Sequence, residues 1–533
     1  MRPTFLAFQT AHRAIATSQI LLDTTGNNIA NVNTDGYTRQ RVDIAAMSNG
    51  GYIQRYKPQD VTAGGGVEAK RVSQIRDQFL DARYRLQNQA DAKYQAVLSG
   101  FKDLENVLDE TMYEGIMNEV ATFKNALGPM LENPFSSDMA MVVRNSAQKI
   151  TSILNTYSTH IDNVRNQQIF DVQSVYVDTQ FNSVVKNIAA LNKQINEEAA
   201  HGNTPNELYD ERNLLFDQLS SLVNTKITIT PKRLSSTLSV EHVQIQMVDD
   251  KTGKTIDLVD DETFNTLSAI TNADGTLRLE VNSAFGNVGL KDITAYVTGG
   301  TLGGSLDVIN GKGAEFGSYM SGDNLFRGTL YYQGMLDTFA ANFARVMNDI
   351  NRYNPNGVQP SDPTAPQLPV NQPRDLFTTI DASAVITARN IKVSVEWMDD
   401  PLYLTVTQPG DKSEGENIGR MMVAITNPQT GFYKQGNTAQ VSVFNNGTFE
   451  EFLTGMSATL GLDVSLYTNY SKTSTYVMGT LFEARESVSG VSLEEEGTYL
   501  MAYQKSYNAA VRYFTVLDEA VDTIINKMGL VGR

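Results

Sequence analysis

The 533-residue sequence contains no cysteine. Disulfide bonds, thiolate metal ligands and cysteine nucleophiles are therefore excluded. Histidine is nearly as scarce: the four histidines are His12, His160, His201 and His242. No two of them stand at the spacing that would place two metal ligands on one helix face. We therefore expect no metal site and no bound cofactor.

Long apolar runs are also missing. No run approaches the ~20 residues that are needed to cross a bilayer, so we expect no membrane insertion. The first residues, MRPTFLAFQTAHRAIATSQ, lack the apolar core and cleavage site of a standard secretory signal. Basic residues are outnumbered, with 43 Lys and Arg against 60 Asp and Glu, and the net charge is −17. Phosphate repels a chain this acidic that lacks a basic patch, which argues against nucleic acid as a partner.

What is present begins with an apolar stripe near the N-terminus. In a predicted helix over about Thr4 to Asn28, apolar or small residues recur at alternating spacings of three and four, which is typical of close packing on another helix. The stripe contains Phe8, Ala11, Ile15, Ser18, Leu22, Thr25 and Ile29.

A second stripe, near the C-terminus, has the same spacing. Its predicted helix begins after Ser492, a hydroxyl cap followed by three glutamates, and stops at Gly529. The stripe contains Leu493, Glu496, Leu500, Tyr503, Tyr507, Ala510, Phe514, Leu517, Val521, Ile524 and Met528, and only Glu496 breaks its pattern. Because an isolated helix would expose such a stripe to water, we expect the two terminal helices to pair. Ser18, Tyr503 and Tyr507 are the members that could instead face a neighbouring subunit.

The stretch GNNIANVNTDG, residues 26–36, ends the first helix. Asparagine and glycine tolerate left-handed backbone, so the segment predicts a chain reversal, with Gly36 as its pivot. The asparagines of this turn are Asn27, Asn28, Asn31 and Asn33, and Ile29, Val32 and Tyr37 are its apolar anchors. A buried amide here would fix the register of the helix pair. We expect Arg39 and Arg41 to pair with the Glu494–Glu496 run or with acids of an adjacent subunit.

The middle of the chain changes period. We expect helices over Phe79–Glu110, 139–198 and Asn206–Val223, then strands within 225–297, a helix ending near Tyr353 and mixed strands over 375–447. The fold class is α+β multidomain, with the terminal helices paired in a coiled-coil or helical-bundle core and β-rich domains inserted in the middle. The expected segments are 1–60, 61–224, 225–300, 301–352, 353–447, 448–490 and 491–533.

A few stretches suggest other chemistry. Gly64–Gly66 lacks the lysine and helix start of a phosphate loop and is interpreted as a flexible link. Asp274-Gly275 predicts a hairpin turn rather than a calcium loop. The run Asp210–Arg212 is interpreted as a charged helix face, and Trp397 as a core residue. We therefore expect no catalytic residues.

Two end motifs resemble a known family. NNIANVNTDGYTRQ, residues 27–40, resembles the N-terminal signature of the bacterial flagellar axial proteins, the family of rod, hook and hook-associated proteins. The C-terminal helix of that family is similar to residues 488–528 here, VSGVSLEEEGTYLMAYQKSYNAAVRYFTVLDEAVDTIINKM. Within the family, YTRQ (37–40), LYDERNLLFDQLSSLV (208–223) and TGGTLGGSLDV (298–308) are similar to the subunits of the hook–filament junction.

The resemblance implies a structural subunit and no enzyme. It implies unfolded export through the flagellar type III apparatus, an extracellular location on the flagellum, and assembly into a ring of neighbouring subunits through the paired terminal helices. The implied partners are further copies of the chain, the hook protein, a second hook-associated junction protein and an export chaperone that engages the C-terminal helix.

Three alternatives are weighed against this interpretation. One is a sibling hook or rod subunit, which the YTRQ and DERN segments argue against. Another is a secreted surface adhesin, with glycan-binding β domains within 224–447. The most distant is an enzyme that depends on Asp210 or Glu211.

Overall fold

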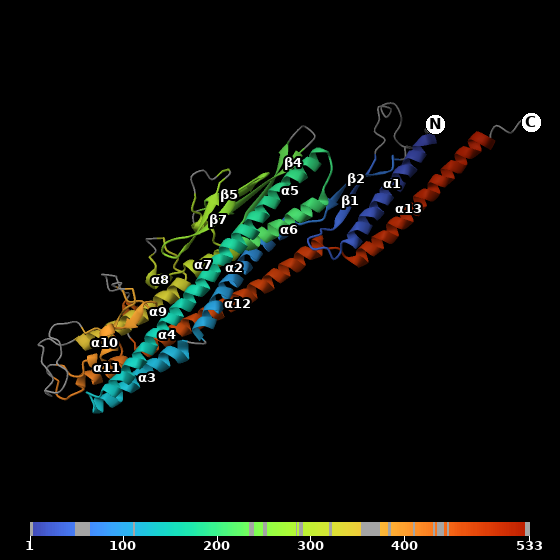
Figure 1. Ribbon diagram of the computed structural model, residues 1–533. Helices are drawn as coiled ribbons and strands as arrows, with labels where there is room; N and C mark the ends of the chain where they lie inside the picture. The colour runs from blue at the N-terminus through green and yellow to red at the C-terminus, as the bar shows by residue number, and fades with distance from the viewer. Residues whose placement is uncertain are drawn as a thin grey trace, which may run out of the picture.

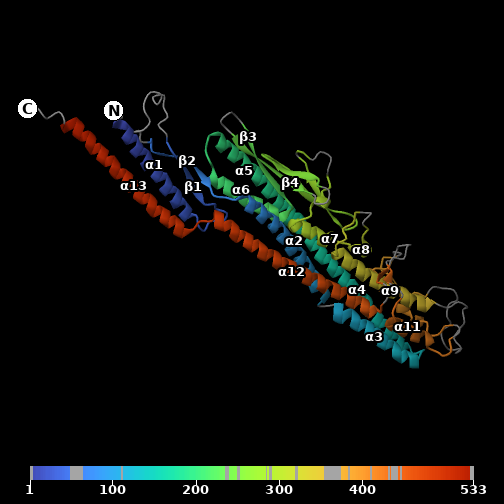
Figure 2. The same cartoon turned by 180° about the vertical axis from the view of Figure 1, so that it is seen from behind.

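The computed structural model is elongated, with both chain ends at the same extremity (Figure 1). It describes residues 4–47, 64–109, 112–233, 239–248, 253–283, 285–286, 291–318, 322–352, 374–381, 385–408, 411–429, 432–433, 442–444 and 447–527. Helix α1 (Thr4–Ala30) lies beside α13 (Leu493–Asp522) at this extremity, as both views show (Figures 1 and 2). This arrangement confirms the predicted pairing of the two ends of the chain.

A β-hairpin connects the terminal helix pair to the rest of the molecule. Strand β1 (Gln40–Ala46) pairs antiparallel with β2 (Val67–Gln74), with a register shift between Asp43 and Ile44. The interpretation of Gly64–Gly66 as a flexible link is wrong, because Gly65 and Gly66 exchange backbone hydrogen bonds with Met47 at the start of β2. Gly66 adopts a positive φ of 91°, which glycine tolerates without steric cost.

Long helices form the body of the molecule. Helix α2 packs along α12, and α3 packs along α4. Helix α4 continues through a π-helical stretch, η3, into α5, so the chain stays helical from Ser137 to Ala200. The bounds of these helices are α2 Gln78–Asp109, α3 Met112–Glu132, α4 Ser137–Phe170, η3 Asp171–Phe181, α5 Asn182–Ala200, α6 Asn206–Leu222 and α12 Phe449–Ser489. Helix α3 was not predicted from the sequence.

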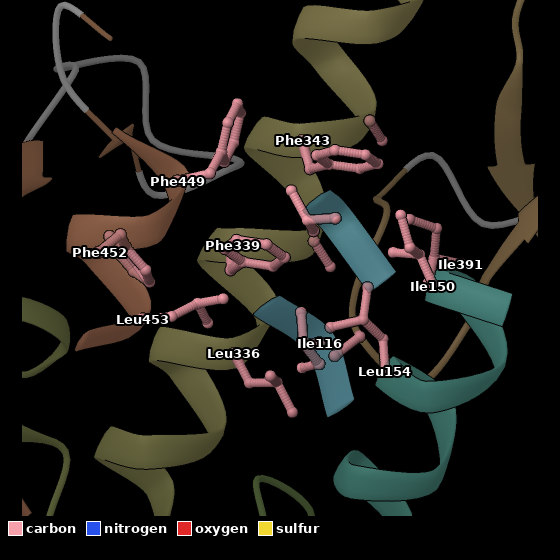
Figure 3. Close-up of a cluster of buried hydrophobic side chains, with 14 of the residues drawn as sticks. Ile116, Ile150, Leu154, Leu336, Phe339, Phe343, Ile391, Phe449, Phe452 and Leu453 are labelled. Atoms are coloured by element: carbon pink, nitrogen blue, oxygen red, sulfur yellow. The ribbon is translucent and has the colours of Figure 1, made fainter. Parts of the chain in front are cut away.

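One hydrophobic core lies at the extremity opposite the chain ends. It joins α3, α4 and α12 with α9 (Thr329–Arg352) and with residues from the 374–447 region. Figure 3 shows Phe339, Phe343 and Phe449 facing one another at its centre. The smaller elements around this core are β9 Phe377–Thr379, β10 Ile391–Val393, α10 Val395–Asp399, η6 Pro401–Tyr403, α11 Glu416–Thr426, β11 Phe432–Tyr433 and β12 Ser442–Phe444. Trp397 is fully buried, which confirms its prediction as a core residue.

A second core lies beneath two small sheets and joins them to η3, α5 and α6. The larger sheet has the strand order β3-β4-β5-β6, and β7 pairs separately with β8 through the turn at Asp274-Gly275. That turn confirms the predicted hairpin. The strands are β3 Lys226–Arg233, β4 Ser239–Val248, β5 Thr255–Asp260, β6 Thr263–Phe264, β7 Thr266–Thr271 and β8 Leu277–Asn282. Residues 294–296, expected in a strand, form the 3-10 turn η4, followed by α7 (Gly300–Asn310) and α8 (Gly313–Phe316).

Candidate assembly site at the terminal helix pair

The terminal helices pair antiparallel, and three contacts define their register. Phe8 meets Phe514 edge to face, with ring centroids 5.2 Å apart. Ser18 Oγ lies 3.4 Å from Ser506 Oγ, and Asn28 Nδ2 donates to Glu496 Oε2 at 3.2 Å. The residue numbers rise along α1 as they fall along α13, so the N-terminal end of each helix meets the C-terminal end of the other.

Small side chains fill the buried face of this pair. The best-buried members on α1 are Ala11, Thr17, Ser18, Thr25 and Asn28, while α13 contributes Glu496 and Ala510. Short side chains let two helices approach closely, which accounts for the many small residues in the N-terminal stripe. The interface therefore owes its shape to close backbone approach more than to bulky apolar packing.

The larger members of the two stripes are only partly covered. The half-buried members are Phe8, Ile15, Leu22, Ile29, Leu500, Tyr503, Tyr507, Leu517 and Val521. Phe514 is 36% exposed, Leu493 and Ile524 are about half exposed, and Met528 lies outside the described residues. Leu493 and Ile524, which the spacing assigned to the buried stripe, are thus open to solvent in the single chain.

Asn28 is the polar centre of the pair and is 1% exposed. Its amide nitrogen donates to Gln40 O and Glu496 Oε2, and its amide oxygen accepts from Gln40 N and the Tyr37 hydroxyl at 3.0 and 2.8 Å. A shift of one residue between the helices would break the bond between the Asn28 amide and the buried Glu496 carboxylate, which is the contact of this amide that crosses from α1 to α13. Glu496, the apparent break in the C-terminal stripe, is therefore a register-fixing residue.

Arg39 completes the junction. Its Nε donates to Glu496 Oε1 at 2.7 Å and its Nη1 to Glu495 Oε2 at 2.9 Å. Burial opposes the charge, but the two carboxylates hold the pKa of Arg39 above its ordinary value. One of the two alternatives for Arg39, pairing with the glutamate run, is thus the contact present within a single chain. Arg41 pairs with Asp43 instead, at 3.3 Å.

The asparagine-rich turn works differently from the prediction. Helix α1 continues to Ala30, so Asn27 and Asn28 belong to its last turn. None of the four asparagines has a positive φ; Gly36 does, at 78°, and it provides the reversal. Asn31 Nδ2 donates to the Asn27 carbonyl at 3.0 Å, which satisfies one carbonyl of the helix end. Asn33 is exposed. The asparagines of this turn therefore act through hydrogen bonds, Asn31 at the helix end and Asn28 in the buried contact, and not through left-handed backbone.

The turn is also attached to the long-helix body through α6. Asp210 Oδ2 accepts from the Thr38 backbone N–H at 3.1 Å, and Oδ1 accepts from Gln74 Nε2 at 2.8 Å. Burial raises the pKa of the Asp210 carboxyl to about 6, although these hydrogen bonds favour its charged form. Burial, together with the nearby Asp210 charge, also raises the pKa of Tyr37.

The interpretation of residues 210–212 as a charged helix face is therefore wrong for two of the three. Asp210 and Arg212 are 8% and 2% exposed, and each has specific partners within the fold. Sequence reasoning also missed Gln40, Gln74 and Asp210 as members of the junction. The periodicity of α6 could not reveal that Asp210 on this helix has a partner, Gln74, on a hairpin that is distant in the sequence.

Further apolar side chains on α13 and just past its end are left uncovered in the single chain. Met501 is 57% exposed, Val516 is 60% exposed and Ile525, just beyond the helix, is 70% exposed. A helix that is apolar on more than one side is typical of burial by several neighbours. Helix α1 covers only one side of α13, so the pair presents an incomplete interface.

The described residues contain no group of three or more His, Asp or Glu that could hold a metal ion. Among the same residues, no helix is both long and apolar enough to span a bilayer.

The sequence is similar to known flagellar proteins. The protein-family model for the flagellar hook-associated protein FlgK helical domain matches residues 101–358. The family model for the flagella basal body rod protein matches residues 8–38. Flagellar hook-associated protein 1 of Bacillus subtilis is 30% identical over 547 residues, with 100% of both chains covered. The Salmonella typhimurium protein of the same name is 22% identical over 567 residues, covering 96% of this chain and 97% of that protein.

A solved structure shares the fold. The flagellar hook junction protein FlgK from Burkholderia pseudomallei superposes with a TM-score of 0.52 at 12% sequence identity, covering 76% of this chain and all of that one. Together with the full-length match to the Bacillus subtilis protein, these findings show that the chain belongs to the flagellar hook-associated protein 1 family.

Proposed function

We propose that the chain is a structural subunit that joins the flagellar hook to the filament and that it assembles through its terminal helix pair. The observation that carries this proposal is the half-covered α13. One side of that helix pairs with α1, while Met501, Val516 and Ile525 stay exposed. Burying such side chains against neighbours contributes roughly 25 cal/mol per Å² of apolar area. Copies of the chain, packed side by side, supply that cover.

The partners follow from a position between two tubular assemblies. Neighbouring copies form a ring, the hook protein contacts one side of it, and a second hook-associated junction protein contacts the other. The subunit acts outside the cell, on the flagellum, after export through the flagellar type III apparatus. An export chaperone that engages α13 would cover its exposed side chains before assembly. Membership of a structural family supports a role without catalysis.

The proposal is tested by placing a charge in the pair. In Phe514→Asp, the contact with Phe8 is lost and a carboxylate must be buried when neighbours pack, so the variant is expected to stay folded but fail to join hook to filament. Phe170→Asp is the matched control, because Phe170 is an exposed aromatic residue on α4. Motility and electron microscopy of isolated hooks provide the readout. Normal swimming by the Phe514→Asp strain would contradict assembly through the pair.

A further inference from the structure

A groove of about 670 Å³ lies where the hairpin, the long helices and the larger sheet meet. Its walls come from β2, the first turns of α2, the α6 helix and β3. The contacts of the terminal pair described above do not extend into most of this groove.

The groove is basic, although the chain is strongly acidic. Arg71, Arg85, Arg212 and Lys226 line it. Its acids are engaged: Asp81 pairs with Arg76 at 2.6 Å, and Glu241 pairs with Arg212 at 2.7 Å. Two more of its cations also have partners, since Arg71 pairs with Asp43 at 2.9 Å and Arg85 with Asp217 at 2.8 Å. Lys226 is exposed and has no ion pair among the residues that the structure describes. The Arg71 side chain stays 68% exposed, so Arg71 and Lys226 are the groove cations that remain open to a carboxylate ligand.

Two buried polar atoms in the groove lining have no partner within the described part of the chain. One is Nε of Arg212, whose side chain is otherwise held by Asn192 and Glu241 and stacked on Tyr209 at 5.0 Å. The other is Oγ1 of Thr225, the residue just before β3. A buried polar group without a hydrogen bond destabilises the fold, so the lining of the groove holds two unsatisfied hydrogen-bonding groups.

Strand β3, whose residues line part of the groove, is an edge strand of its sheet. Strand β3 pairs only with β4 in the described sheet order, so its other edge has no strand beside it. The presence of Pro231 in β3 agrees with an edge position, because proline cannot donate to a ladder. Ile227 and Ile229 on β3 and Leu86 on α2 add an apolar lining. Open edges accept extended peptides, with backbone bonds for affinity and side-chain pockets for selectivity.

We infer that this groove binds an extended acidic segment of another polypeptide along the edge of β3. Carboxylates of that segment meet Lys226, Arg71 and the Arg212 Nε, its backbone pairs with β3, and its alternate apolar side chains meet the groove lining. This inference goes beyond the proposed function, since it concerns a surface separate from the terminal pair and applies to the single folded chain.

The test uses a fluorescein-labelled octapeptide of alternating glutamate and valine, with binding to the full chain followed by fluorescence anisotropy. The peptide should bind saturably and more weakly at high salt. The Arg71→Glu/Lys226→Glu variant should weaken binding by about tenfold, and Thr225→Val by a few-fold. The matched control is Lys149→Glu/Lys193→Glu, which makes the same charge change at exposed positions on α4 and α5 outside the groove.

Two further peptides separate charge from strand pairing. A lysine–valine octapeptide should not bind, and the glutamate–valine peptide with alternate N-methylated amides should lose most of its affinity, because it cannot extend the sheet. Absence of saturable binding by the unmodified peptide would overturn the inference. Equal binding by the groove variant and the control variant would also overturn it. Thr225→Val keeps the net charge, so its result is independent of any charge effect on folding.

Discussion

The terminal helix pair and the core around α9 bury their side chains in opposite ways. In the core, Phe339, Phe343 and Phe449 are fully enclosed by side chains of the same chain. In the pair, the fully covered residues are small or polar, while Met501 and Val516 face solvent. The difference shows that one region is complete within a single subunit, whereas the other is one part of a larger interface. The two regions should therefore respond differently to the same substitution.

The largest difference should come from phenylalanine truncation. Phe339 packs against Phe343, Phe449 and Phe452, so Phe339→Ala is expected to lower the free energy of unfolding by about 3–5 kcal/mol. Phe514→Ala, on a side chain that is 36% exposed, should cost the isolated subunit far less. Urea denaturation followed by circular dichroism measures both. Similar losses for the two variants would show that the pair is already a complete core in one subunit.

The buried polar hub of the pair should be its most sensitive point. Asn28→Asp places a second carboxylate beside Glu496, whose Oε2 lies 3.2 Å from the Asn28 amide. We expect a loss of about 2–3 kcal/mol in the stability of the pair, seen as faster amide exchange in α1 and α13 but not in α9. Asn33→Asp is the control, because Asn33 belongs to the same turn and is exposed.

A second substitution sharpens this experiment. Adding Glu496→Gln to Asn28→Asp restores a neutral partner beside the new carboxylate, so the double variant should recover much of the lost protection. If Asn28→Asp alone left α1 and α13 as protected as in the unmodified chain, the hub would not fix the register of the pair.

The pH dependence of stability should separate the two regions as well. Burial raises the pKa to about 6 both for Asp210, beside the terminal turn, and for Asp337, in the core-forming helix α9. Because the folded state then binds protons more readily than the unfolded state, each group's contribution to stability falls as the pH rises through 6. Between pH 5 and pH 7 the loss is about 1 kcal/mol per group.

Replacing each aspartate with asparagine shows which region loses stability as the pH rises. Asp337→Asn should flatten the pH dependence of the urea midpoint for the core, and Asp210→Asn should flatten the pH dependence of amide exchange near Thr38. The contact that carries the second effect is the hydrogen bond from the Thr38 backbone to Asp210. An unchanged pH dependence in both variants would contradict the raised pKa values.

The sequence predicted the pairing of the terminal helices, because their spacing of three and four is a local property of each helix. It also predicted the cap of α13, since the Ser492 hydroxyl accepts from the Glu495 N–H within the first turn of that helix. It predicted that Arg39 could pair with the glutamate run, but not that Glu496 bonds to Asn28, because those two residues lie 468 positions apart. The burial of Asp210 was missed for the same reason: Thr38 and Gln74 reach it from a hairpin that α6 does not reveal.

The assignment of stripe members to a subunit interface stays a prediction. Spacing marks which residues share a face but not how far a partner helix covers that face. Ile15 and Leu22 are half-buried by the chain itself, and Leu493 and Ile524 remain open. The domain boundaries expected from composition likewise stay predictions, because burial in a shared core can join segments that differ in period.

The smallest expected effect concerns the middle of the pair. Ser18 is buried, but its hydrogen bond to Ser506 is long, at 3.4 Å, and Ser506 itself is exposed. Ser18→Ala removes that weak bond, keeps the close approach of the helices and adds a better helix former, so stability should change by less than about 0.5 kcal/mol. Ser18→Leu, which needs space that the small-residue face does not provide, should cost about 1–3 kcal/mol. Comparing the two by urea denaturation measures how tightly the backbones are packed. If leucine were tolerated as well as alanine, the small residues of α1 would not be there for close approach.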